Sequence, residues 1–161
     1  MTMDQKWLRH VLSQHHESAY RWSCQCCHYD DELAKDVLQQ TYLKIMEGKA
    51  TFDQRSQLIT WLFSIIRFTA YDELKKRDRV NYTSLELIEG HAEFNVNDRL
   101  DFRKELERLS EKQKEVMLLV FYHEMTIEAA AEVMNCSLGT ARTHYQRGKE
   151  QLKKLLENER G

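Results

Sequence analysis

Residues 126–150 read TIEAAAEVMNCSLGTARTHYQRGKE, and this stretch decides the fold of the C-terminal part of the chain. Residues 126–134 predict a short helix, because a threonine ahead of an apolar run is a typical N-cap. Residues 135–137 form a short polar turn, and a second helix is predicted from 138 to about 157. Ala131 offers the small side chain that two closely crossing helices need. The pattern is that of a helix-turn-helix.

The second of these predicted helices has two different faces. The apolar side combines Leu138, Ala141, Tyr145, Gly148 and Leu152 at steps of three and four. The opposite side carries groups that can donate to phosphates or to base edges in the major groove; they are Thr140, Arg142, Thr143, Gln146 and Arg147. An ordinary amphipathic hairpin with a solvated basic face is the alternative interpretation.

Composition extends the helical prediction to the whole chain. Proline is absent from the 161 residues and glycine occurs five times, whereas average usage predicts about eight prolines. Both residues interrupt helices, so the fold class is predicted to be all-α. The formal charge of −2 is uneven. Residues 138–154 hold five basic side chains against one acidic, and residues 78–98 hold one basic against five acidic.

Helical periodicity is interrupted once, and the interruption divides the chain. In the N-terminal part, Trp7, Val11, His15, Ala19 and Trp22 predict one continuous helix. A second helix is expected over about 31–47 with Gly48 as its C-cap, and a third is expected to be capped by Ser56. Periodicity fades over 78–98, apart from a predicted turn at 84–88, and resumes with a capping box at Ser110 and Gln113. We therefore expect two small helical domains joined by a flexible linker.

Three C-terminal segments carry a resemblance to a known family. LSEKQKEV (109–116), MTIEAAAEVM (125–134) and GTARTHYQR (139–147) are similar to the fourth conserved region of extracytoplasmic-function sigma factors of bacterial RNA polymerase. The resemblance implies that Thr140, Arg142, Thr143, Gln146 and Arg147 contact the −35 promoter element. It also implies a region 2 domain over 1–77, an acidic linker over 78–98 and a region 4 domain over 99–161.

The N-terminal segment AKDVLQQTYLKI (34–45) resembles the part of region 2 that binds the clamp helices of the polymerase. Helical geometry turns Leu38, Thr41, Tyr42 and Ile45 inward. The residues then expected to face the core polymerase are Asp36, Gln39, Gln40 and Leu43. The alternative is a plain solvated face that includes one leucine.

Two further segments, WLFSIIR (61–67) and DELKKR (72–77), resemble the helix that meets the −10 promoter element. The family captures a flipped base with the preceding loop, here about 49–57, where Phe52 is a stacking candidate and a buried loop anchor is the alternative. Phe68 stands where the family commonly has Asn, so the usual −10 base preference is in question. The predicted −10 contacts are Phe52, Arg55, Trp61, Arg67, Phe68, Lys75, Lys76 and Arg77.

One cysteine cluster could carry separate chemistry. Cys24, Cys27 and His28 lie within one helical turn of one another, and thiolates with imidazole suit zinc. The spacing matches no standard zinc pattern, so these residues are weak candidates and the expectation is no metal and no cofactor. Small core residues and reduced thiols are the alternative. Phosphate loops, zinc-protease motifs and nucleophile elbows are absent, so the chain is not expected to be an enzyme.

The predicted function is promoter recognition and duplex opening as a sigma factor, with core RNA polymerase and promoter DNA as partners. An anti-sigma factor or another recruiter is a further expected partner. No segment has the roughly 18 consecutive apolar residues of a membrane span, and the N-terminus has no apolar signal core, so a cytoplasmic location is expected. The rival interpretations are a metal- or redox-sensing helical protein and a DNA-binding regulator without polymerase contact.

Overall fold

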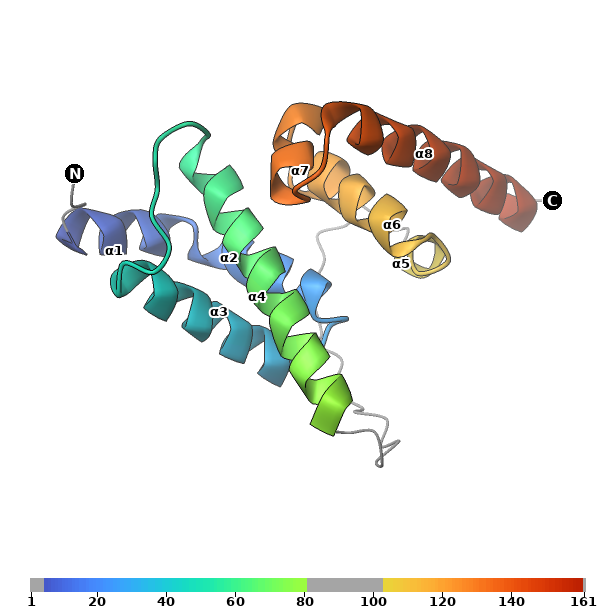
Figure 1. The fold of residues 1–161 in the computed structure, drawn as a ribbon. Helices are drawn as coiled ribbons and strands as arrows, with labels where there is room; N and C mark the ends of the chain where they lie inside the picture. Colours follow the sequence, from blue (N-terminus) through green and yellow to red (C-terminus); the bar gives the residue numbers. More distant parts are fainter. Residues whose placement is uncertain (1–4, 81–102, 161) are drawn as a thin grey trace. The chain divides into compact units, whose positions relative to one another are not determined.

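The computed structural model describes residues 5–80 and 103–160, without the side chains of residues 79, 80, 103, 159 and 160. The chain divides into two compact units, 1–93 and 94–161. The described part consists of helices and connecting loops and contains no strand (Figure 1), so the all-α prediction is confirmed. The first unit holds α1 (Gln5–Gln14), α2 (His16–Cys26), α3 (Asp31–Met46) and α4 (Leu58–Val80). The second holds α5 (Arg103–Leu106), α6 (Glu111–Met117), the π-helix η1 (Leu118–Tyr122), α7 (Ile127–Val133) and α8 (Leu138–Arg160).

The prediction of one continuous N-terminal helix is wrong. The chain breaks at His15, whose φ of −103° and ψ of 7° leave the helical region, and α2 starts anew after it. The break changes which stripe is buried: Leu8 and Leu12 enter the core, while Trp7 stays 44% exposed. Both stripes have helical spacing, so the sequence pattern alone could not choose between them.

The core of the first unit is organised around Trp22 of α2 and Phe63 of α4. Both side chains are fully buried, and their rings stack with centroids 5.5 Å apart and planes inclined by 4°. The Trp22 indole Nε1 donates to the Phe63 carbonyl at 3.0 Å, so the polar atom of the tryptophan is satisfied inside the core. Ser23 similarly donates to the carbonyl of Ala34 at 2.8 Å. These contacts fix α2 against both α3 and α4.

The ends of α3 and α4 test two local predictions. Asp30 caps α3 by accepting from the Leu33 amide at 3.2 Å. The C-cap of α3 is Glu47, so the C-cap expected at Gly48 lies one residue too late; Gly48 follows with a φ of +76°, the left-handed conformation common after a helix. The expected cap at Ser56 is wrong, because α4 begins at Leu58. The predicted turn at 84–88 lies outside the described residues.

In the second unit the predicted helix starts are confirmed. Ser110 and Gln113 form a reciprocal capping box at the start of α6, and Thr126 accepts from the Ala129 amide at the start of α7. Asn135 adopts a φ of +54° in the turn before α8. A Cβ atom on Gly148 would lie 3.2 Å from the Cγ atom of Met117. Glycine at this position therefore lets α8 pass close to α6.

Candidate functional site

The helix-turn-helix of the second unit presents the predicted outward face. Ala141 and Gly148 are buried on the inner side of α8. The Thr140 amide donates to Ser137 Oγ at 3.1 Å, and Thr143 Oγ1 donates to the Gly139 carbonyl at 3.0 Å. These bonds hold the first turn of α8 in place. The side chains on the outer side are all exposed, as a groove-reading helix requires; they are Thr140, Arg142, Thr143, Gln146 and Arg147.

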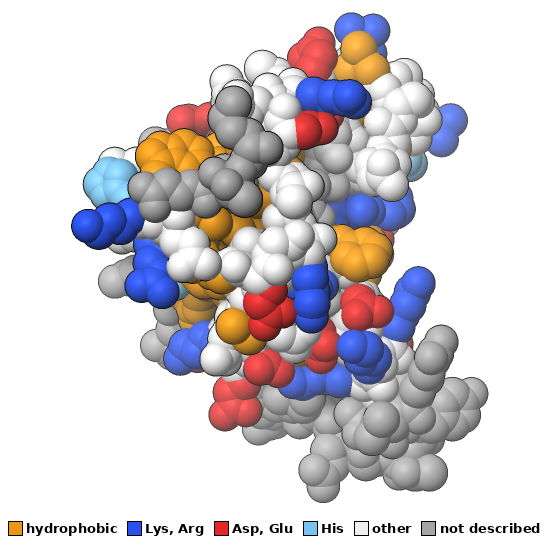
Figure 2. Space-filling view, turned by 60° about the vertical axis from the view of Figure 1, so that its left-hand side comes forward, with side chains coloured by type: hydrophobic (Ala, Val, Ile, Leu, Met, Phe, Trp, Pro, Cys, Tyr) orange, Lys and Arg blue, Asp and Glu red, His pale blue; other side chains and the backbone are white. Residues whose placement is uncertain are grey.

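The outer face of α3 in the first unit is likewise open. Asp36 and Gln39 are exposed, Gln40 is half-buried, and Leu43 exposes 50% of its surface. Leu38, Thr41 and Ile45 enter the core as predicted, whereas Tyr42 is only half-buried. Figure 2 shows hydrophobic side chains open to the surface between charged ones on one face of the molecule.

Beside these residues lies a groove that sequence reasoning missed. It has a volume of about 510 Å³ and is lined by side chains of α2 and α3. Gln39 and Leu43 belong both to this lining and to the predicted polymerase-binding residues. His16 Nδ1 and the Tyr42 hydroxyl lie 2.9 Å apart at its wall. Residues on two separate helices form this groove, so only the packing of α2 on α3 reveals it.

The loop before α4 places the aromatic candidates together. The Phe52 and Trp61 rings lie with centroids 5.2 Å apart at an angle of 48°, and both side chains are half-buried. Phe52 therefore anchors the loop on α4 while keeping part of its ring accessible. Arg55 is exposed and pairs with Asp53 at 3.5 Å.

Arg67 does not lie on the surface with the other predicted −10 residues. It is 8% exposed, with its guanidinium 4.4 Å above the Tyr71 ring and an Nη2 donor 3.3 Å from the Tyr71 hydroxyl. A guanidinium held in this way stabilises α4 and is withdrawn from phosphates. Phe68, the next residue, exposes 68% of its surface.

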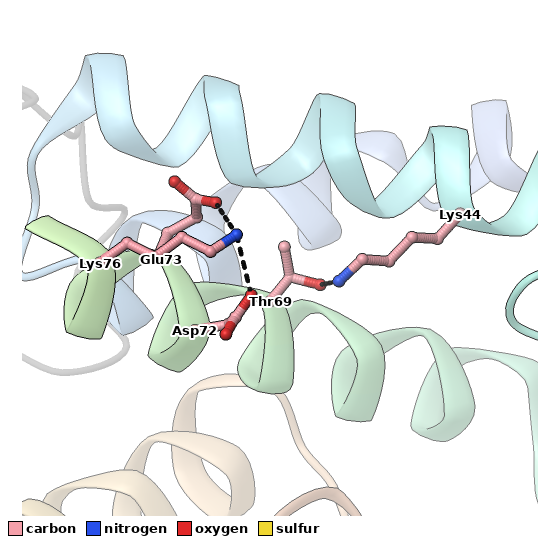
Figure 3. Close-up of polar contacts among 5 residues, drawn as sticks. All are labelled: Lys44, Thr69, Asp72, Glu73 and Lys76. Atoms are coloured by element: carbon pink, nitrogen blue, oxygen red, sulfur yellow. Dashed lines mark hydrogen bonds and ion pairs between the residues drawn. The ribbon is translucent and has the colours of Figure 1, made fainter.

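The basic end of α4 is partly neutralised by its own carboxylates (Figure 3). Lys76 Nζ lies 3.3 Å from Asp72 and 3.6 Å from Glu73. The hydrogen bond to Asp72 and the charges of both carboxylates raise the pKa of Lys76. Arg77 lies 3.6 Å from Asp30, while Lys75 is exposed.

Comparison with known proteins matches both units to one family. Residues 7–80 match Sigma-70 region 2, and residues 99–152 match Sigma-70 region 4. The sigma factor EcfG of Rhodopseudomonas palustris is 30% identical over 135 residues, which cover 78% of this chain and 72% of the relative. The chain belongs to the extracytoplasmic-function sigma factors. It is an RNA polymerase sigma factor of transcription initiation.

Other relatives and solved structures of sigma factors are similar to this chain over most of its length. The sigma factor YlaC of Bacillus subtilis is 28% identical over 140 residues, covering 80% of each chain. The structure of RpoE from Bartonella quintana, solved in complex with the anti-sigma factor NepR, has a TM-score of 0.76 and 26% identity, covering 94% of this chain and 98% of that one. CnrH, solved with the cytosolic domain of CnrY, shares the fold with a TM-score of 0.66 at 18% identity.

The cysteine cluster of this sigma factor is not arranged as a metal site. Cys24 and Cys27 are buried in the core, and desolvation raises the pKa of each thiol to about 12. His28 is exposed at a φ of +53°. Within residues 5–80 and 103–160, no group of three metal-ligating side chains comes together. The burial of both thiols favours the structural interpretation, in which they act as small core residues.

None of the helices in the described part of the chain is long and apolar enough to cross a bilayer.

Proposed function

We propose that this sigma factor reads the −35 promoter element with α8 and the −10 element with α4. The observation that carries the proposal is the outer face of α8, where five polar and basic side chains are exposed on a helix-turn-helix. Arg142 and Arg147 supply charge and bidentate donors, which suit guanine edges and phosphates.

Core polymerase binding is assigned to the outer face of α3. Asp36, Gln39 and Leu43 combine carboxylate, amide and apolar surface beside a groove. A mixed surface of this kind suits a protein partner better than open solvent. The factor then acts in the cytoplasm with the polymerase, which performs the chemistry of transcription.

An anti-sigma factor is the third proposed partner. The support is the likeness to RpoE, whose structure was solved in complex with such a protein. Its effect would be measured as loss of core polymerase binding when the two proteins are mixed.

The test of the −35 assignment is the salt dependence of promoter binding by the holoenzyme. Each phosphate contact contributes about 0.9 to the slope of log K against log salt concentration. The double variant R142A/R147A is expected to lower that slope by up to about 1.8 on −35 fragments. K104A, which removes an exposed charge from α5 of the same unit, should leave the slope unchanged. An unchanged slope in the double variant would contradict the assignment.

A further inference from the structure

Phe68 is exposed at a position where α4 is otherwise enclosed. Its neighbours Ile66, Arg67, Thr69 and Ala70 are all buried, whereas Phe68 exposes 68% of its surface. A single exposed apolar side chain is common on protein surfaces, so exposure alone identifies no site. The surroundings of the ring provide the second observation.

The side chain of Lys44 is held beside this ring from a different helix. It reaches from α3 to α4, where its Nζ donates to Thr69 Oγ1 at 3.0 Å (Figure 3). The same ammonium lies 5.5 Å from the centroid of the Phe68 ring. Because an ammonium has three protons and Thr69 accepts one of them, Lys44 can be anchored and still donate to a phosphate. An aromatic surface and a positioned cation therefore occur together.

The same face of α4 continues this arrangement along the helix. Trp61, Phe68 and Lys75 are spaced seven residues apart, which places them along one side of the helix with a drift of only about 20° per step. Phe52 contacts Trp61 at one end, and Lys75 is exposed at the other. Aromatic surfaces beside cations are the combination that binds single-stranded nucleic acid.

We infer that Phe68 and Lys44 form a stacking site for one unpaired base of the opened −10 element. The base stacks on the exposed Phe68 ring, and Lys44 contacts the adjoining phosphate. The inference rests on the proposed reading of the −10 element by α4. Stacking accepts every base, because each has a π-face, whereas an amide at this position would read base edges. Little base discrimination is therefore expected at this nucleotide.

The test measures binding of holoenzyme to single-stranded oligo(dT) of about 12 nucleotides, within the usual site size of single-strand binders. One 2-aminopurine is moved along the oligonucleotide, and its fluorescence quenching reports stacking. Core polymerase alone provides the blank. F68A is expected to reduce the quenching and to weaken binding about 5- to 140-fold, the range that stacking of one base contributes. F68Y should retain both signals.

Matched variants separate the two residues and control for folding. K44Q keeps an amide donor for Thr69 but removes the charge, so the salt slope should fall by about 0.7 while the quenching remains. W7A removes a 44% exposed aromatic ring from α1 of the same unit and should bind like the wild type. F68N should gain a base preference at the same nucleotide.

The outcomes distinguish this inference from the function on which it rests. Wild-type affinity and quenching in F68A, in a holoenzyme that still binds the oligonucleotide, overturn the stacking site alone. A wild-type holoenzyme that binds the oligonucleotide no better than core polymerase overturns the −10 assignment as well.

Discussion

Thiol reactivity tests the structural interpretation of the cysteine cluster against metal or redox sensing. Cys24 and Cys27 are buried, and their pKa values rise from 9.0 to about 12. Near pH 8, about one ordinary thiol in ten is ionised, but only about one in 10⁴ with a pKa near 12. Since the thiolate is the nucleophile, these two residues should react about 10³-fold more slowly than ordinary thiols. Cys26 and Cys136, which are partly exposed, should react first.

The assay is alkylation with iodoacetamide, mapped by mass spectrometry, on native protein and on protein in denaturing guanidinium chloride. Two cysteines are expected to be labelled rapidly in the native state and all four after unfolding. A parallel zinc titration should show no stoichiometric binding. Rapid native labelling of Cys24 and Cys27, or one equivalent of zinc that protects them, would refute the reasoning and restore the sensor interpretation.

Three stability predictions follow from the same structure. The raised pKa values of Cys24 and Cys27 imply a contribution to the free energy of unfolding that is fully present below about pH 9 and is lost as the pH rises toward 12. The loss amounts to up to about 1.4 kcal/mol per pH unit for each thiol. Denaturant titrations between pH 8 and pH 11 measure it, and a free energy of unfolding that does not change with pH would contradict it. S110A removes the capping box of α6 and should cost about 1 kcal/mol of unfolding free energy, whereas S110T should restore most of it. R67A should lower the free energy of unfolding by about 1–3 kcal/mol, because the stacking on Tyr71 is lost. It should leave unchanged the dependence of −10 DNA binding on salt concentration. A weaker salt dependence in this variant would show that Arg67 contacts DNA.

Features decided by local chemistry could be predicted from the sequence. The caps at Ser110 and Thr126 depend on a side chain and an amide three residues apart, and both formed as expected. The outward face of α8 was also predictable, because its inner side is marked by small and apolar residues such as Ala141 and Gly148.

Features decided by packing between helices could not be predicted. The break at His15 is marked by no glycine or proline, and the helical spacing continues through it. Arg67 was assigned to the −10 contacts because its segment resembles the family's −10 helix, but its side chain is buried and its guanidinium lies against the Tyr71 ring. The position of Lys44 beside Phe68 depends on how α3 packs against α4, and no local sequence pattern encodes that packing.

Reconstituted transcription tests the central claim most directly. Core RNA polymerase is assayed with and without this protein on genomic promoter fragments, and start sites are mapped. We predict new start sites that depend on the protein and that are lost when Arg142 and Arg147 are both replaced by alanine. Polymerase that neither binds the protein nor gains a start site would contradict the account.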